Sequence, residues 1–151
     1  MIYARFLVLL FLVGCASKTP NDYLIWASLP TPGVFQDNVK WSLFLLDKQG
    51  AIIRSMVVEF TQDTTQTCSS GDFKKLKIIS EYPERSELFL GEPAYEIKGA
   101  ALIIDLSANL CDAGYELRGK VSGVGVEGYH QPVSMFGGEV VGRFYGVPVK
   151  Q

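Results

Sequence analysis

Three cysteines and one histidine are the side chains of this chain best suited to covalent, metal or acid–base chemistry. Cys68 and Cys111 lie far apart, and neither belongs to a Cys-x-x-Cys pair. A structural zinc ion needs four such ligands, and His130 is the only imidazole available to complete a set. A reactive thiol needs an electropositive neighbourhood, which neither of these cysteines has in the sequence. The sequence therefore predicts no metal site and no cofactor.

His130 would titrate near neutral pH, and a general base of that kind needs a hydroxyl nucleophile and an orienting acid beside it. Ser134 is near in sequence, but no Gly-x-Ser-x-Gly motif is present. Acidic pairs such as Glu84 and Glu87 would need a cleft to act as glycosidase carboxylates, and loop carboxylates are usually solvated. We therefore predict that the chain is not an enzyme and that His130 lies in a surface loop.

The segment from Gly123 to Gly128 matches the pattern Gly-x-Gly-x-x-Gly. In dinucleotide-binding proteins these glycines join a strand to a helix whose N-terminus holds the pyrophosphate. Here the residues that follow, Tyr129 to Pro132, open no helix, and too little chain remains for a second strand. The pattern predicts a glycine-rich hairpin.

The first fifteen residues have the parts of an export signal. Arg5 is followed by eight apolar residues from Phe6 to Val13, a run too short to cross a bilayer core about 30 Å thick. The residues Leu12-Val13-Gly14-Cys15 resemble the bacterial lipobox. That resemblance implies cleavage before Cys15 and acylation of Cys15. In such lipoproteins, an Asp directly after the cysteine is associated with retention in the inner membrane. Because Ala16 occupies that position here, the resemblance implies the outer membrane. The alternative is an ordinary signal peptide that ends near a cysteine.

Acylation of Cys15 would leave Cys68 and Cys111 as an even remainder in an exported protein, which predicts a disulfide. The bridge would close a segment of 44 residues. In the chain-entropy model, a disulfide that closes a loop of that length stabilises the folded protein by about 4 kcal/mol. The alternative is two separate buried thiols.

The rest of the chain consists of short apolar runs separated by turns, without a helical period over ten or more residues. From Tyr115 to Gly123 the alternation places Leu117, Gly119, Val121 and Gly123 on one face. We therefore predict an all-β domain over 23–151, a small antiparallel barrel or sandwich of about eight short strands, after a signal peptide over 1–14 and a lipidated tether over 15–22. The runs that predict strands are 23–26, 41–46, 51–60, 73–80, 95–99, 101–106, 115–123 and 140–145.

Fourteen basic against sixteen acidic side chains argue against a partner held by phosphate neutralisation, so we expect no nucleic acid. The segment from Phe136 to Gly146 resembles the closing hairpin of surface lipoprotein barrels related to transferrin-binding protein B. That resemblance, over about eleven residues, implies a small lipoprotein barrel.

These observations predict a lipid-anchored module of the cell envelope that binds or assembles with an envelope protein and has no catalytic role. Two alternatives remain open: a lipocalin-like carrier of a small apolar ligand, and an inhibitor of an envelope hydrolase that uses the loop 81–93. Aromatic side chains often dominate interfaces. The candidate partner-binding loop residues are Tyr82, Phe89, Tyr129 and His130.

Replacing Cys15 by Ser tests the predicted anchor, because serine cannot accept the lipid thioether. We expect Cys15→Ser to leave the membrane fraction, or to keep the mass of residues 1–14. Fractionation and intact-mass measurement check this expectation. Unchanged membrane partition together with an unchanged mass after signal removal would contradict the lipobox assignment.

Overall fold

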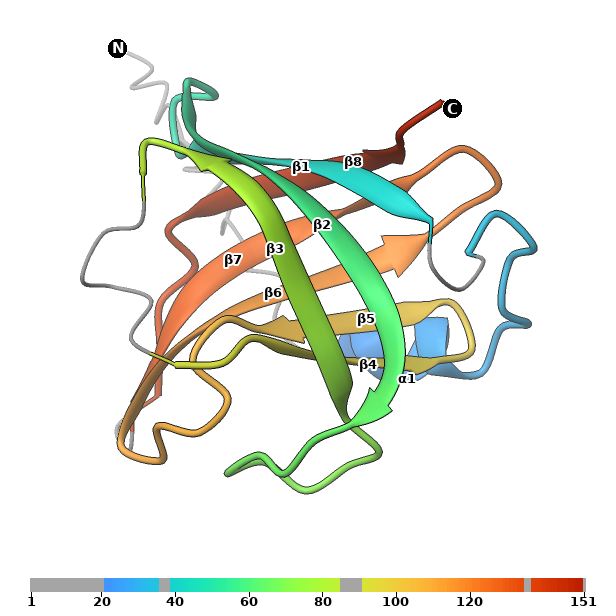
Figure 1. The fold of residues 1–151 in the computed structure, drawn as a ribbon, viewed down its shortest axis with the longest axis horizontal. Helices are drawn as coiled ribbons and strands as arrows, with labels where there is room; N and C mark the ends of the chain where they lie inside the picture. The colour runs from blue at the N-terminus through green and yellow to red at the C-terminus, as the bar shows by residue number, and fades with distance from the viewer. Residues whose placement is uncertain (1–20, 36–38, 85–90, 135–136, 151) are drawn as a thin grey trace, which may run out of the picture.

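The computed structural model describes residues 21–35, 39–84, 91–134 and 137–150, and these form a closed antiparallel barrel of eight strands (Figure 1). Each strand pairs with the next in the chain, and the last pairs with the first, so the predicted all-β fold is a barrel. Closure removes the unpaired edges that an open sheet would expose. The strands are β1 (Lys40–Asp47), β2 (Ile52–Thr64), β3 (Lys74–Tyr82), β4 (Ala94–Lys98), β5 (Ala101–Asp105), β6 (Ala113–Val121), β7 (Val126–Ser134) and β8 (Gly142–Pro148).

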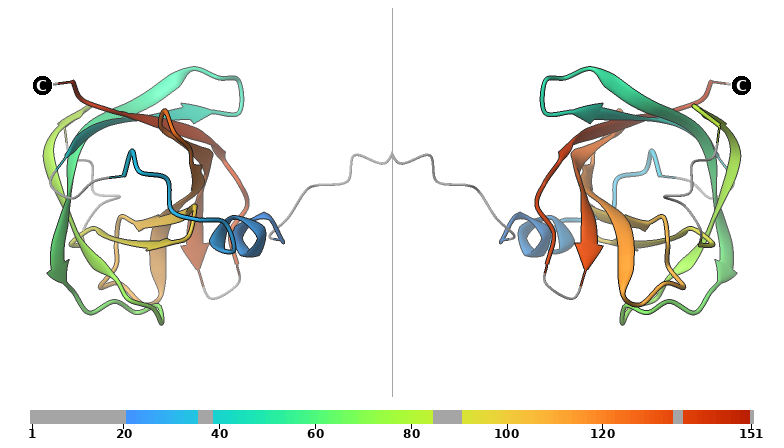
Figure 2. Two further views of the ribbon diagram at one scale, coloured as in Figure 1. Left: turned by 90° about the vertical axis from the view of Figure 1, so that its right-hand side faces the viewer. Right: turned by 90° about the vertical axis from the view of Figure 1, so that its left-hand side faces the viewer.

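One helix, α1 (Asn21–Ala27), precedes the barrel and lies outside its wall (Figure 2). The prediction of a strand over 23–26 is therefore wrong. Tyr23 and Trp26 share the half-buried side of the helix, while Leu24 and Ile25 are exposed. This helix is too short for hydrophobic periodicity to identify it in the sequence. Within the described residues no helix has the length and apolar character needed to cross a bilayer.

Close backbone approach holds α1 on the barrel. The N–H of Ala100, in the β4–β5 turn, donates to the Trp26 carbonyl oxygen at 2.9 Å. Gly99 in that turn has a φ of 58°, and an added Cβ would lie 2.4 Å from the Ala27 carbonyl oxygen. Glycine is therefore required there both by its left-handed conformation and by the lack of space.

Alternate residues of each strand fill the barrel with large apolar side chains. Phe60 lies at the centre of an aromatic cluster, with ring centroids 4.8 Å from Tyr95, 6.0 Å from Trp41 and 4.5 Å from Phe35. Phe35 comes from the segment before β1, so this segment packs against one part of the core. The largest fully buried apolar side chains are Trp41, Phe60, Phe144, Leu43, Leu45, Leu102, Ile104, Leu106, Leu117, Val58 and Val121.

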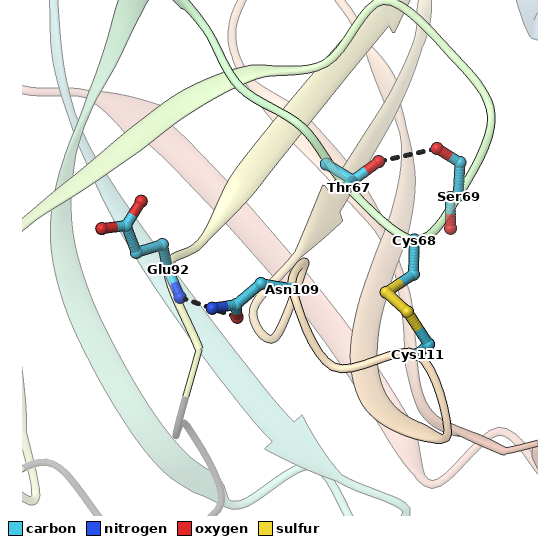
Figure 3. The surroundings of a disulfide bond; sticks show 6 residues. All are labelled: Thr67, Cys68, Ser69, Glu92, Asn109 and Cys111. Atoms are coloured by element: carbon cyan, nitrogen blue, oxygen red, sulfur yellow. Dashed lines mark hydrogen bonds between the residues drawn. A yellow bond between two sulfur atoms is a disulfide. The ribbon is translucent and has the colours of Figure 1, made fainter.

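The predicted disulfide between Cys68 and Cys111 is confirmed (Figure 3). It joins the β2–β3 loop to the β5–β6 loop, and the Cys68 N–H also donates to the Ala108 carbonyl oxygen at 2.9 Å. Asn109 accepts a hydrogen bond from the Glu92 N–H at 3.3 Å, which adds the segment before β4. The bridge thus belongs to a junction of three connections that are distant in sequence.

The glycine-rich hairpin predicted over 123–128 is confirmed as the turn between β6 and β7, but only part of the predicted inner face is correct. Gly119 points inward, and an added Cβ would lie 2.7 Å from both the Glu127 carbonyl oxygen and the Phe144 ring. Gly123 was expected on the same face, and that expectation is wrong. Because β6 ends at Val121, Gly123 lies exposed in the turn, and an added Cβ would have no atom within 4 Å.

The matched pair Gly119→Ala and Gly123→Ala tests this difference. We expect Gly119→Ala to lower the free energy of unfolding by about 1–3 kcal/mol, because the methyl group overpacks a filled interior. Gly123→Ala should change the free energy of unfolding by less than about 0.5 kcal/mol. Urea denaturation of both variants measures the effect, and equal losses would contradict the inward orientation of Gly119.

Candidate functional site

His130 lies on β7 inside the barrel with no exposed surface, so its predicted place in a surface loop is wrong. Its Nε2 lies 2.8 Å from the Leu46 carbonyl oxygen. Because a carbonyl oxygen only accepts, Nε2 carries the hydrogen, and Nδ1 accepts a hydrogen bond from the Tyr115 hydroxyl. Both ring nitrogens are thus engaged, and the imidazole ties β7 to β1 and β6.

A buried ion pair lies among the same inward-facing residues. The Arg54 guanidinium Nη1 lies 2.7 Å from Glu81 Oε2, and the two side chains are 8% and 11% exposed. Burial raises the pKa of Tyr115, although the nearby Arg54 charge opposes the shift, so the hydroxyl stays protonated as a donor. Removing one member of a buried ion pair typically lowers the free energy of unfolding by about 3–5 kcal/mol. The Arg54–Glu81 pair therefore contributes to the stability of the barrel.

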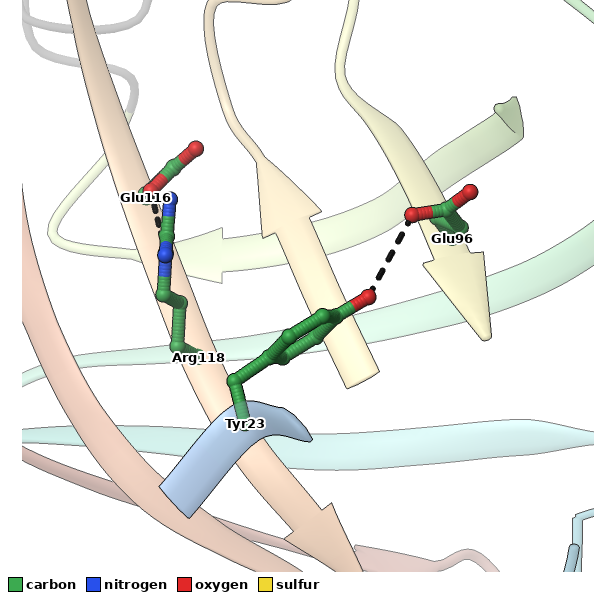
Figure 4. A network of polar contacts seen from close by, with 4 residues as sticks. All are labelled: Tyr23, Glu96, Glu116 and Arg118. Carbon is green, nitrogen blue, oxygen red and sulfur yellow. Dashed lines mark hydrogen bonds and ion pairs between the residues drawn. The ribbon is translucent and has the colours of Figure 1, made fainter. Parts of the chain in front are cut away.

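A second polar network lies outside the wall, between α1 and the strands below it (Figure 4). The Tyr23 hydroxyl donates to Glu96 Oε2 at 3.4 Å, and Arg118 Nε donates to Glu116 Oε2 at 2.7 Å. Burial first, and then the negative charge of Glu96, raises the pKa of Tyr23 and keeps its hydroxyl a donor. This network helps hold α1 on the barrel.

Asp105 and Glu116 face each other across β5 and β6 and are both largely buried. Burial raises the pKa of Asp105, the Glu116 charge adds to this, and the hydrogen bond from the Ser107 N–H opposes it. Within the described residues, no group of three or more His, Cys, Asp or Glu side chains could hold a metal ion. Asp105 accepts a hydrogen bond from the Ser107 N–H, and Glu116 accepts one from Arg118 Nε, so both carboxylates have partners within the protein.

The outer surface of four adjacent strands carries the most distinctive arrangement. Tyr145, Phe44, Ser55 and Tyr82 are directly opposed in register on β8, β1, β2 and β3. The Phe44 and Tyr145 rings stack, with centroids 4.9 Å apart and planes 23° apart. We call these four residues the aromatic row. In Figure 1, β8 and β1 run along the top of the barrel, and β2 and β3 cross its front.

A second row beside the aromatic row also lacks charge. We call it the valine–serine row, and it continues across the same four strands in the same register. The two rows together form what we call the uncharged face. The members of the valine–serine row are Val147, Ser42, Val57 and Ser80.

Small side chains between large ones hollow this face. Ser55 separates the rings of Phe44 and Tyr82, and a notch of about 210 Å³ opens there. Its other lining residues are Ser42, Met56, Val57, Ser80 and Glu81, and the Glu81 carboxylate is paired with Arg54. On the other side of Tyr145 a wider groove of about 730 Å³ lies between the β1–β2 turn and β7–β8. The stacked Phe44 and Tyr145 rings therefore separate the two hollows, since Phe44 lines the notch and Tyr145 lines the groove. Tyr82, which is 77% exposed, borders the notch.

Charged residues border the uncharged face. Lys40, Glu59 and Lys77 are opposed in the next row on β1, β2 and β3, and the Glu59 and Lys77 side chains approach to 3.9 Å. On the other side, the next row contains the exposed Arg143 of β8, which lies beside the wider groove, together with Leu46 of β1 and Ile52 of β2. An apolar centre with charged residues at its border is a composition expected of a protein-binding surface.

The structure separates the four residues predicted to form a partner-binding loop. Tyr82 lies at the end of β3 on the aromatic row, whereas Tyr129 is a half-buried residue of β7, opposed to Arg118 and Arg143. Tyr82 and Tyr129 are therefore strand residues, so their predicted loop positions are also wrong. Phe89, like most of the loop predicted for an inhibitor, lies outside the described residues.

Phe44 and Tyr145 were not among the residues predicted to bind a partner. Both residues occupy outward positions in their strands, and the alternation of inward and outward residues along a strand indicates such positions in the sequence. Their contact, however, depends on the pairing of β1 with β8, which no local pattern contains.

Comparisons of this chain with protein-family models, with curated proteins and with solved structures find no match.

Burial lowers the pKa of His130 from its ordinary value of 6.5, although the bond to the Leu46 carbonyl opposes the shift. The unfolded chain therefore takes up this proton more readily than the folded protein. We expect the free energy of unfolding to fall as the pH drops below about 6.5, with a slope of up to about 1.4 kcal/mol per pH unit. Urea denaturation between pH 5 and pH 8 measures it.

The variant His130→Gln provides the control, because His130 is the only histidine in the chain. The variant should lose stability at pH 8 but show a flatter dependence between pH 5 and pH 7. An unchanged slope in the variant would assign the pH dependence to other groups.

Proposed function

We propose that this chain is a lipid-anchored protein of the bacterial cell envelope that binds an envelope protein through the uncharged face. The observation that carries the proposal is the notch between Phe44 and Tyr82, where Ser55 leaves room for an apolar side chain of a partner. The barrel acts as a rigid scaffold and takes no part in catalysis.

The composition of the face indicates the chemistry of the partner. Burying Tyr145, Tyr82 and Val147, which are 39%, 77% and 44% exposed, would remove apolar surface from water at about 25 cal/mol per Å². The basic residues Lys40 and Arg143 at the border favour a partner segment with an apolar centre and acidic flanks. Rigid aromatic side chains lose little conformational entropy on binding, which favours them as anchors.

The position of the face supports separate sites for anchoring and recognition. Helix α1 follows the predicted lipidation site and contacts β5 and β6, which lie four strands away from β1 and β2 around the barrel. The uncharged face thus points away from the side where the anchor would enter. Ala16 after Cys15 supports the outer membrane as the location.

The packed interior favours recognition on the outside over carriage of a ligand inside. Trp41, Phe60 and Phe144 occupy the space that a lipocalin-like carrier would leave for its ligand. The paired side chains of Arg54 and Glu81 and of Tyr115 and His130 fill a further part of the barrel. The binding module is therefore preferred to the carrier.

Photo-crosslinking from the face in intact cells tests the proposal. A photoreactive phenylalanine analogue replaces Tyr82, which preserves an aromatic ring at the notch. We expect it to trap one envelope protein, and we expect the same analogue at the exposed Lys120 of β6 to trap none of it.

A charge placed in the aromatic row provides the second arm. Tyr145→Asp should reduce the Tyr82 crosslink at least about thirtyfold, the effect of losing about 2 kcal/mol at an interface hot spot. The circular dichroism of the variant verifies that the barrel is intact. Equal crosslinking from Tyr82 and Lys120, or a crosslink unaffected by Tyr145→Asp, would contradict this function.

A further inference from the structure

We infer that α1 is a second membrane contact, whose exposed apolar residues insert into the surface of the bilayer that holds Cys15. This inference rests on the proposed lipid anchor. It assigns the outward side of the helix, formed by Leu24 and Ile25 together with Leu29 just beyond the helix, to the interface between headgroups and acyl chains.

The apolar side chains project from a fixed base. Leu24, Ile25 and Leu29 are 69%, 58% and 38% exposed. The opposite side of α1 is held by the hydrogen bond from the Ala100 N–H to the Trp26 carbonyl and by the Tyr23 hydroxyl on Glu96. A docked helix has already lost much of its conformational freedom, so insertion would cost less ordering entropy than for a free segment.

The length of the connection brings this helix close to the lipid. Six residue steps separate Cys15 from Asn21, where α1 begins, and a fully extended chain spans at most about 3.6 Å per residue. The start of α1 would therefore lie within about 22 Å of the acylated cysteine. Because α1 lies outside the barrel wall (Figure 2), no strand separates its outward side from the bilayer.

The charge of the region selects the kind of lipid contact. Between Ala16 and Phe35 the sequence has only two charged side chains, Lys18 and Asp22, of opposite sign. Attraction to anionic headgroups needs clustered Lys and Arg residues, which this region lacks. The contact is therefore an apolar insertion that takes place equally well in zwitterionic lipid.

The contact would also set the orientation of the barrel. A single flexible anchor permits any orientation, whereas an anchor together with α1 fixes one side of β5 and β6 toward the membrane. The uncharged face, on the far side of the barrel, would then face away from the membrane and toward its partner.

Fluorescence of the intact lipidated protein in phosphatidylcholine vesicles with brominated acyl chains tests the inference. The variant Ile25→Trp places a reporter on α1, and Ile53→Trp places one on β2, at a position 46% exposed on the far side. The two native tryptophans, Trp26 and Trp41, give a background common to both and are subtracted with the parent protein. We expect a blue shift and bromine quenching of the added emission for Ile25→Trp, and neither for Ile53→Trp.

Vesicle flotation distinguishes a failure of the proposed lipid anchor from a failure of the membrane contact of α1. Protein that does not float lacks the lipid anchor, and then the proposed anchoring itself fails. Protein that floats, with the Ile25→Trp reporter unquenched, overturns the membrane contact of α1 and leaves the anchor standing. A blue shift without bromine quenching would show that another protein copy covers the helix, and would also overturn the bilayer contact.

Discussion

The pairing of β1 with β8 is the interaction on which the rest of the molecule depends. It joins residues about a hundred positions apart, from Trp41 opposite Pro148 to Asp47 opposite Gly142, and converts a curved sheet into a barrel. Glycine makes the approach possible, since a Cβ on Gly142 would lie 1.9 Å from the Leu46 carbonyl oxygen. Closure removes both edges, encloses the aromatic core and brings Phe44 onto Tyr145.

Closure also determines where polar chemistry is located. An inward polar group in a filled barrel has no water to bind, so it needs a protein partner. Arg54 has Glu81, and His130 has both Tyr115 and the Leu46 carbonyl. These inward groups hold neighbouring strands of the barrel together. Function is then to be sought on the outside, where register aligns side chains from four strands.

The two distinctive outer surfaces lie on opposite sides of the barrel. Helix α1 covers β5 and β6 and presents its apolar side away from them, whereas the uncharged face spans β8 to β3. The disulfide belongs to neither surface, because it joins loops that connect strands. A rigid barrel between two such surfaces holds them at a constant separation, which is compatible with the proposed tether on one side and the proposed partner site on the other.

The sequence by itself determined the elements whose signal is local. Alternation identified most strands, turn residues placed the hairpins, and the parity of Cys68 and Cys111 after Cys15 predicted the bridge. Only the tertiary structure decided that the segment 23–26 is a helix, because its half-buried side, with Tyr23 and Trp26, is held by contacts with distant strands. It also decided the burial of His130 and the alignment of Tyr145, Phe44 and Tyr82. These features depend on strand register and closure, and such long-range pairings leave no trace in the local order of residues.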